Sequence, residues 1–340
     1  MHNCPPRAPC TRLFFAYTQP APVNAPAGRE PGNGAFTMIP KPPPREGQIG
    51  FLYIPPYRIQ GTSVAGEATT LMVPELDVCF DMGAPLRCAL ASKYVALTHG
   101  HMDHIGGLAY YASQRQFQGM GEGTIVCDKR IAPDVHKMMR GFNDLERQKT
   151  PYQLIELDEN EELEVKNNIF LRGFATEHTS PSFGWTLVEK RSKLKPELVG
   201  LPQEKLRELK DRGQEITNTL EVPLIANTGD TLPGPHLVRD DVRKAQVVVS
   251  ECTFFEPEHK GRAKIGMHLH IDDIAEWSRV LECEALILVH VSRRTNITYA
   301  RKRLDDLLSG ESRERVHLLM DHRACRERYE RQAAEAGTAS

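Results

Sequence analysis

The most constraining feature of this chain is a run of three histidines and one aspartate, His-x-His-x-Asp-His, at residues 99–104. It directly follows a β-branched, apolar segment that is typical of a buried strand, and it opens a helix-like stretch. Alternate spacing in an extended turn can direct His99 and His101 to one point, while Asp103 and His104 turn toward a neighbouring one. Neutral imidazole nitrogens suit zinc, and an interleaved carboxylate adds negative charge for a second cation. The motif therefore predicts a site for two metal ions.

Two metal ions need more ligands than one motif supplies, and three further residues stand in the right kind of place. His178 and Asp230 come soon after predicted strands at 169–175 and 223–227, and His290 ends a third strand. In α/β sheets the carboxyl ends of the strands gather the functional loops. Taken singly, each residue has an ordinary alternative: a surface histidine, a turn-forming aspartate and a core histidine. Their common position favours metal ligation.

A carboxylate and a histidine form a second candidate pair. Glu251 ends the apolar strand predicted at 246–250, and His268 precedes the helix predicted at 271–282. A carboxylate that orients an imidazole and stabilises its charged form makes a proton donor. The alternatives are a structural ion pair for Glu251 and a contact with the helix N-terminus for His268. His270 competes with His268 and is expected to support the site or cap the helix.

Predicted strands and helices alternate after the first 44 residues without a break in composition. The strands are predicted at 49–54, 69–73, 78–81, 94–98, 124–127, 152–157, 162–166, 169–175, 183–189, 223–227, 246–250, 286–290 and 316–320. The helices are predicted at 104–117, 132–147, 202–212, 271–282 and 297–309. Gly61 and Pro74 are interpreted as turn residues. Strands first, and then strands alternating with helices, indicate a layered α/β architecture.

Proline distinguishes an N-terminal segment from the rest of the chain. Residues 1–44 hold 11 of the 24 prolines and few charged or aliphatic side chains. Because proline removes backbone donors and blocks helices, we predict a disordered or polyproline-like leader at 1–44 and the folded domain at 45–335.

A chain that begins at Met38 is accordingly expected to keep full activity and melting temperature. The reason is that a segment of this composition cannot bury enough apolar surface to become ordered. Thermal denaturation and activity assays on the shortened chain test this, and loss of either property would show that the leader packs on the domain.

Charge and cysteine usage exclude several classes of protein. With 43 basic and 45 acidic residues the net charge is −2. This excludes a protein that coats nucleic acid through a broadly cationic surface, so any contact with RNA needs a local basic patch. No segment approaches the ~18–20 apolar residues of a membrane span, and none has a signal-peptide core. We therefore predict a cytoplasmic protein without a membrane partner. The eight cysteines contain no C-x-x-C pair, which argues against a disulfide framework or a zinc knuckle.

Several motifs together resemble those of the tRNase Z family, which belongs to the metallo-β-lactamase superfamily. In chain order they are THGHMDHIGGL, TEHTSPSFGW, NTGDT, ECTF, a Gly-x-His before a helix, and LILVHVSRR. The resemblance covers about residues 49–310. It implies an αββα sandwich, in which two β-sheets are flanked by helices, with two Zn²⁺ ions, or alternatively Mn²⁺, at one edge. The family usually forms homodimers.

The resemblance also implies roles for individual residues. It assigns seven ligands to two zinc ions: His99, His101 and His178 to one, Asp103, His104 and His290 to the other, and Asp230 as a bridge between them. Glu251 and His268 match the family's proton-donating pair. In the implied reaction Asp103 orients or deprotonates the water nucleophile, and His268 protonates the departing 3′ oxygen. Arg293 and Arg294 lie just beyond the last histidine motif and are candidates for contacts with flanking phosphates.

The predicted function is therefore that of a dinuclear zinc phosphodiesterase, an endoribonuclease that removes the 3′ trailer from precursor tRNA. Two departures from the family pattern concern the substrate. The stretch between His178 and Asp230 is short and lacks the Gly-Pro-rich signature of the arm by which long forms hold tRNA, so it resembles the armless short form. In addition, Thr295 stands where the family usually has an aromatic residue.

Two other functions remain open from the sequence. The first is a hydrolase of the same fold with a small substrate, such as a cyclic-nucleotide phosphodiester or a thioester. The second is an RNA-binding protein on an inactive scaffold. The complete set of seven ligands argues against the second, because a decayed site should have lost at least one of them.

Overall fold

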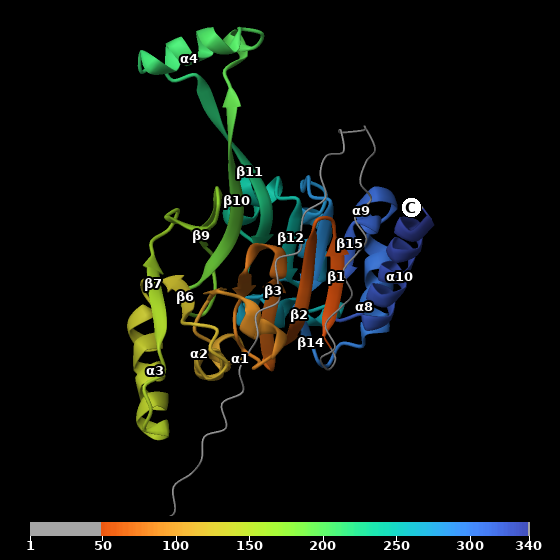
Figure 1. Cartoon of the computed structure of the whole chain (residues 1–340). Coiled ribbons are helices and arrows are strands. Elements are labelled where there is room, and N and C mark those ends of the chain that lie inside the picture. Colours follow the sequence, from red (N-terminus) through yellow and green to blue (C-terminus); the bar gives the residue numbers. More distant parts are fainter. Residues whose placement is uncertain (1–48, 339–340) are drawn as a thin grey trace, which may run out of the picture. The chain divides into compact units, whose positions relative to one another are not determined.

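Two β-sheets packed face to face form the centre of the protein (Figure 1). The computed structural model describes residues 49–338, and all of these fall within one compact unit. The leader predicted at 1–44 therefore lies outside the described residues, as does the start of the domain predicted at 45–335. Among the described helices, none has both the length and the apolar character needed to cross a bilayer.

Each sheet combines antiparallel hairpins with parallel strands. The first sheet, in spatial order, contains β1 (Gly50–Ile54), β2 (Tyr57–Ala65), β3 (Ala68–Val73), β4 (Val78–Phe80), β5 (Tyr94–Ala96), β6 (Gly123–Asp128) and β7 (Tyr152–Leu157), with β14 (Val291–Ser292) beside β2. The second sheet contains β15 (Val316–Leu318), β13 (Ala285–Val289), β12 (Val247–Glu251), β11 (Thr217–Asn227), β10 (Phe183–Leu194), β9 (Ile169–Ala175) and β8 (Glu162–Lys166).

Side-chain alternation along the strands lets each sheet pack on both faces, which gives four layers of helix, sheet, sheet and helix. In β12, Val247 and Val249 pack between the two sheets, whereas Val248 packs outward with residues of the helices that cover the second sheet. The outer face of the first sheet is covered in the same way. The helices are α1 (Met102–Ile105), α2 (Leu108–Phe117), α3 (Ala132–Glu146), α4 (Gln203–Asp211), α5 (Asp240–Arg243), α6 (Lys260–Gly266), α7 (Ile271–Trp277), α8 (Ile297–Leu307), α9 (Gly310–Glu314) and α10 (His322–Thr338). This is the predicted αββα sandwich.

Glycines account for two differences from the predicted elements. The single helix predicted at 104–117 is two helices, α1 and α2, separated by Gly106 and Gly107. A Cβ atom on Gly107 would lie 2.8 Å from the carbonyl oxygen of Met82, so the close approach of this loop requires glycine. Gly61 was interpreted as a turn residue, but it lies inside β2, where a Cβ atom would collide with the backbone of β3 at Thr70.

The C-terminal helix α10 was not predicted, and neither were the short elements α5, α6, α9 and β14. The sequence of α10 is rich in arginine and glutamate and has no continuous apolar stripe. Its position is set by tertiary contacts: the ring of Tyr329 packs edge-on against Phe51 of β1, and Cys325 is buried in the core between the sheets. Packing of this kind stabilises a helix that its own periodicity does not indicate.

The stretch between His178 and Asp230 does form a projecting arm, so the prediction of an armless chain is wrong. Strands β10 and β11 continue as a two-stranded ribbon beyond the sheet, and α4 lies at its tip (Figure 1). The predicted strands at 183–189 and 223–227 are accordingly too short. Their outer halves are largely polar and exposed, so they lack the apolar alternation from which a strand is normally predicted.

Candidate metal centre

The predicted site residues meet at one edge of the sandwich because of the strand directions. Strands β11, β12 and β13 are parallel, and β9 runs in the same direction because β10 is antiparallel to both β9 and β11. His178, Asp230 and His290 follow the carboxyl ends of β9, β11 and β13, and Glu251 is the last residue of β12. The His-x-His-x-Asp-His segment follows β5 in the facing sheet and leads into α1.

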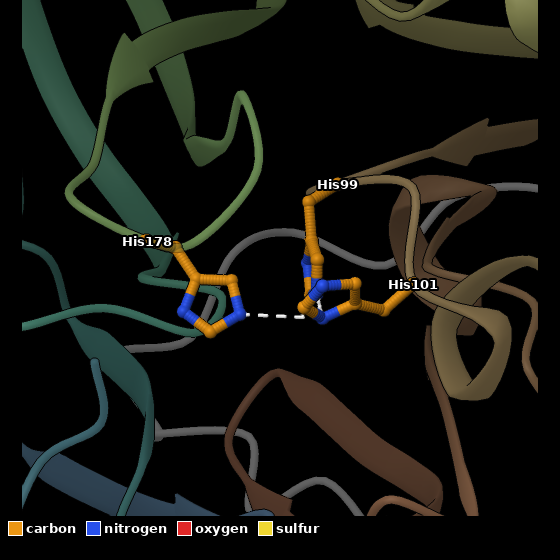
Figure 2. A group of neighbouring side chains, drawn as sticks. All are labelled: His99, His101 and His178. Carbon is orange, nitrogen blue, oxygen red and sulfur yellow. Dashed lines mark hydrogen bonds between the residues drawn. The ribbon is translucent and has the colours of Figure 1, made fainter. Parts of the chain in front are cut away.

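Three histidines converge in the first cluster, as Figure 2 shows. Nε2 of His99 lies 2.9 Å from Nδ1 of His101, and Nε2 of His178 lies 3.3 Å from that same Nδ1 atom. His99 is fully buried, whereas His101 and His178 are partly exposed. Three ring nitrogens at this spacing present lone pairs to one another, which is the arrangement that a cation between them would stabilise.

The second cluster combines His104, His290 and Asp103. The Oδ2 atom of Asp103 lies 3.4 Å from Nε2 of His290 and 3.7 Å from Nε2 of His104. Asp230 lies between the two clusters: its Oδ2 atom is 3.3 Å from Nε2 of His290, 3.4 Å from Nε2 of His104 and 3.9 Å from Nε2 of His99. A carboxylate in this position can contact ions in both clusters.

Hydrogen bonds behind the histidines select which ring nitrogen faces the site. The Nδ1–H of His104 donates to Oδ2 of Asp81 at 2.8 Å, and that of His178 donates to the carbonyl of Met267 at 3.0 Å. Since Thr98 Oγ1 already donates to Asp81, it accepts from Nδ1–H of His99. These rings therefore direct their Nε2 atoms inward, as metal-bound histidines do.

The same logic gives His290 and His101 their orientations. Thr253 Oγ1 donates to Glu251 and so accepts from Nδ1–H of His290, 3.0 Å away. His101 has the opposite arrangement, because its Nε2 atom faces Thr179 and its Nδ1 atom faces the site. The Nε2 atom of His104 is buried and has no hydrogen-bond partner among the described residues. A buried polar atom without a partner is unfavourable, and a metal ion at that position would satisfy it, so the residues fit two divalent ions.

Burial and neighbouring charges shift the pKa values of the candidate ligands in directions that favour binding of a cation. Burial lowers the pKa of His99 to about 2 and also lowers the pKa of His178, so both rings are neutral. Burial acts against ionisation of Asp230, yet the neighbouring histidines His290 and His104 hold its pKa well below the usual range. At His104 burial is outweighed by Asp230 and Asp81, which raise its pKa. The carboxylates of Asp230 and Asp81 thus favour a positive charge at the His104 ring, whether it is a proton or a metal ion.

Glu251 and His268 form a direct pair at the border of the second cluster. Nδ1–H of His268 donates to the Glu251 carboxylate at 3.0 and 3.1 Å. Burial lowers the pKa of His268, but the charge and hydrogen bond of Glu251 outweigh it and raise the pKa to about 9. Glu251 is buried and also accepts from the backbone N–H of Thr231 at 2.7 Å and from Thr253. The carboxylate therefore holds His268 and, at the same time, the loop that carries Asp230.

The remaining predicted residues have simpler surroundings. Arg293 and Arg294 are exposed just beyond His290, and Arg293 forms an ion pair with Glu67. Thr295 is buried and donates to Glu256. His270 caps the N-terminus of α7, which is one of the two roles expected for it.

Sequence reasoning missed residues that position the ligands. Asp81 orients His104 and Thr98, and the backbone N–H of Gly66 in the β2–β3 turn donates to Oδ2 of Asp103 at 2.9 Å. Asp81 stands at the carboxyl end of β4, so the signal that found Asp230 could have found it. Asp81 and His290 both adopt left-handed backbone conformations, with φ of 59° and 58°. Such strain costs about 1–3 kcal/mol and is typical of functional sites.

Asp81→Asn is expected to weaken metal affinity by about 10–100-fold, the usual effect of removing a carboxylate behind a metal-bound histidine. An amide has only one acceptor oxygen, so it cannot accept both from the backbone N–H of Thr98, which binds Oδ1, and from the Nδ1–H of His104 at Oδ2. Competition with a chromogenic chelator measures the affinity. Asp77→Asn is the matched control, because Asp77 also has positive φ but is half-exposed and distant from the histidines. Equal affinity in both variants would contradict the orienting role of Asp81.

Comparisons with known proteins find similar sequences. A family model described as Anti-Pycsar protein Apyc1 matches residues 83–198. The chain is 33% identical over 268 residues to the chloroplastic tRNase Z TRZ2 of Arabidopsis thaliana, covering 77% of this chain and 75% of that protein. It is 32% identical over 261 residues to tRNase Z TRZ1 of the same plant, covering 75% of this chain and 90% of that protein.

Solved structures share the fold at lower identity. The metallo-β-lactamase fold protein YhfI from Bacillus subtilis aligns with a TM-score of 0.55 at 14% identity, covering 79% of this chain and 95% of that one. The short form of human tRNase Z aligns with a TM-score of 0.50 at 18% identity, covering 72% of this chain and 93% of that one. The fold and the family imply a dinuclear metal site, in agreement with the adjoining clusters described above. Given its identity to plant relatives over most of both chains, this chain belongs to the tRNase Z family of the metallo-β-lactamase superfamily.

Proposed function

We propose that this protein is a zinc-dependent endoribonuclease that removes the 3′ trailer from precursor tRNA. Membership in the tRNase Z family supports the reaction class. The observation that carries the proposal is the meeting of two metal-ligand clusters with a histidine–carboxylate pair at one sheet edge. Neutral imidazoles and carboxylates are ligands that zinc prefers, and Mn²⁺ is the alternative for the same donor set.

In this proposal the ligands divide as the two clusters do. His99, His101 and His178 would hold one ion, Asp103, His104 and His290 would hold the other, and Asp230 would contact both. Two such ions, when bound, supply a water nucleophile at neutral pH and neutralise charge on the phosphate. The chain itself positions that water through Asp103, whose Oδ2 atom is fixed by the N–H of Gly66.

His268 is the proposed proton donor to the departing 3′ oxygen of the tRNA. Its Nδ1–H is occupied by Glu251, which leaves Nε2 as the nitrogen that can meet the substrate. A cavity of about 520 Å³ adjoins this histidine and is lined by Lys260 and Lys264 among other residues. We propose that the nucleotide next to the scissile bond enters this cavity. Arg293 and Arg294, exposed beyond His290, are proposed to contact flanking phosphates.

Assembly and location belong to the proposal as well. A homodimer is proposed from the family resemblance, and sedimentation of the purified protein would measure it directly. A cytoplasmic location remains a prediction from the sequence, and one plant relative is named as chloroplastic.

Cleavage of a 3′-extended precursor tRNA transcript is the decisive test. The full-length protein with Zn²⁺ is expected to cut once, after the discriminator base, leaving a 3′ hydroxyl on the tRNA and a 5′ phosphate on the trailer. Mature tRNA and chelator-treated protein are the controls, and a parallel reaction with Mn²⁺ compares the metals. An intact transcript together with rapid turnover of a cyclic nucleotide or a thioester would replace this proposal with the small-substrate alternative.

A further inference from the structure

Four arginines and a histidine line a second cavity, of about 330 Å³, which contains none of the predicted metal ligands. It lies where α8, α9 and α10 meet the edge strand β15 (Figure 1) and shares no lining residue with the metal centre. The cationic side chains are Arg301, Arg313, Arg328 and Arg331, and the imidazole is that of His317. Leucine and valine side chains from β15 and the neighbouring elements supply apolar lining.

Two of the arginines are held rigidly by the fold. Arg301 donates through Nε to Oδ2 of Asp321 at 2.8 Å. Arg313 donates to Oδ1 of Asp305 at 2.6 Å and to the carbonyl of Val316 at 3.0 Å. Because each has a carboxylate partner, their charges are largely balanced within the protein.

Arg328 and Arg331 lack such partners. Within residues 49–338 neither forms an ion pair, and the Nε atom of Arg328 is buried without an acceptor. Nε atoms of Arg303 and Arg315 are also buried and unpaired, but other nitrogens of those two side chains contact a carboxylate or carbonyls. No guanidinium nitrogen of Arg328 has a hydrogen-bond acceptor in the described part of the chain.

Neighbouring groups further disfavour the unpaired positive charge of Arg328. Burial and the nearby charge of Arg331 lower the pKa of Arg328 by more than Cys325 and the carboxylate of Glu335 raise it. Burial, together with Arg328 and Arg313, lowers the pKa of His317 to about 4, so its ring is neutral and offers an N–H donor. Glu314 is a further carboxylate of the lining and forms no ion pair with a described residue. The buried Nε–H of the half-buried Arg328 is unfavourable without an acceptor, and an anion in the cavity would supply one.

We propose that this cavity binds a nucleoside monophosphate, with its phosphate on Arg328 and Arg331 and its base against the apolar lining. Arginine presents paired N–H donors that match phosphate oxygens, and it is the residue preferred for that role. The volume of about 330 Å³ lies at the lower end of the ~300–1,000 Å³ range of small-molecule sites, which suits one nucleotide rather than an oligonucleotide.

Calorimetric titration of the full-length, metal-loaded protein with AMP tests this proposal, with adenosine and inorganic phosphate as partial ligands. AMP is expected to bind most tightly, and Arg328→Ala is expected to weaken it by at least about tenfold, as loss of a charge-assisted hydrogen bond does. Arg326→Ala is the matched control, because Arg326 is exposed on the same helix and does not line the cavity. It should leave the affinity unchanged within about twofold. Equal affinity in the wild type and Arg328→Ala, or no binding of AMP, would overturn the proposal.

Melting temperatures distinguish a binding role from a structural one. Without ligand, Arg328→Ala should melt no lower than the wild type, because the substitution removes a buried Nε–H that has no acceptor. AMP should raise the melting temperature of the wild type and of Arg326→Ala but not of Arg328→Ala. Arg331→Ala, at an exposed position, repeats the binding test without disturbing the core. A lowered melting temperature in Arg328→Ala with undiminished AMP binding in Arg331→Ala would overturn the proposal. So would a raised KM for precursor tRNA in both variants without AMP binding.

Discussion

His268→Ala is expected to keep both metal ions and to lose about 10²–10⁴ in turnover on precursor tRNA, the usual contribution of general acid catalysis. His268 contacts Glu251 at 3.0 Å and lies 3.9 Å from Asp230. It also lies in two further groups of possible ligands, one with His178 and Asp230 and one with Glu251 and His290, so metal content has to be measured beside the rates. The loss should shrink on a nitrophenyl phosphodiester, because that leaving group departs without a proton.

Metal analysis and the two rate ratios together test this role. His259→Ala is the matched control, since His259 pairs with Glu256 outside the ligand clusters and should leave both rates unchanged. A zinc-depleted His268→Ala, or an equal loss on both substrates, would instead make His268 a metal ligand.

Glu251→Gln is expected to affect two properties: proton donation by His268 and the position of the loop that carries Asp230. Besides orienting His268, the carboxylate accepts from the N–H of Thr231 and from Thr253, which in turn supports His290. A change at Glu251 therefore reaches the loop of Asp230 as well as the proton donor.

Asp230→Ala is expected to empty both metal positions, whereas His178→Ala should mainly weaken one. The Oδ2 atom of Asp230 lies within 3.9 Å of inward-facing nitrogens of both clusters, while His178 contacts only the first. Removing a bridging carboxylate leaves two dications facing each other with less negative charge between them. Metal content per chain should fall further in Asp230→Ala than in His178→Ala, and activity should fall with it.

Elemental analysis after gel filtration measures the metal content, and circular dichroism checks that each variant is folded. Asp230→Asn keeps the shape of the side chain and removes its charge, so it separates electrostatic from packing effects. Near-normal metal content in both Asp230→Ala and His178→Ala would remove these residues from the site.

Local patterns predicted those elements whose residues alternate or repeat clearly. The strands at 152–157, 162–166 and 169–175 have the predicted bounds, and the helix predicted at 132–147 differs from α3 by one residue. Each is short, bounded by turn residues and periodic, so neighbouring side chains carry the whole signal. The fold class and the family followed from ordered motifs, which depend on residue identity alone.

Other elements depended on contacts that a local pattern does not contain. Strand β2 contains Gly61, which a local pattern assigns to a turn, and it forms because β1 and β3 pair with it on either side. Helix α10 is held by Phe51 and the core, and the outer halves of β10 and β11 extend because they pair with each other. In all three cases the stabilising partner lies elsewhere in the chain.

By itself, the sequence determined which side chains are available for metal binding and which strand ends carry them, because ligand type and strand periodicity are local properties. Only the tertiary structure decided that Asp81, Thr98 and Thr253 select the ring nitrogens that face the site. It also decided that the Nε atom of Arg328 is buried without an acceptor among the described residues. The physical reason is that hydrogen-bond partnership and burial depend on distances between distant segments, and those distances exist only once the two sheets have packed together.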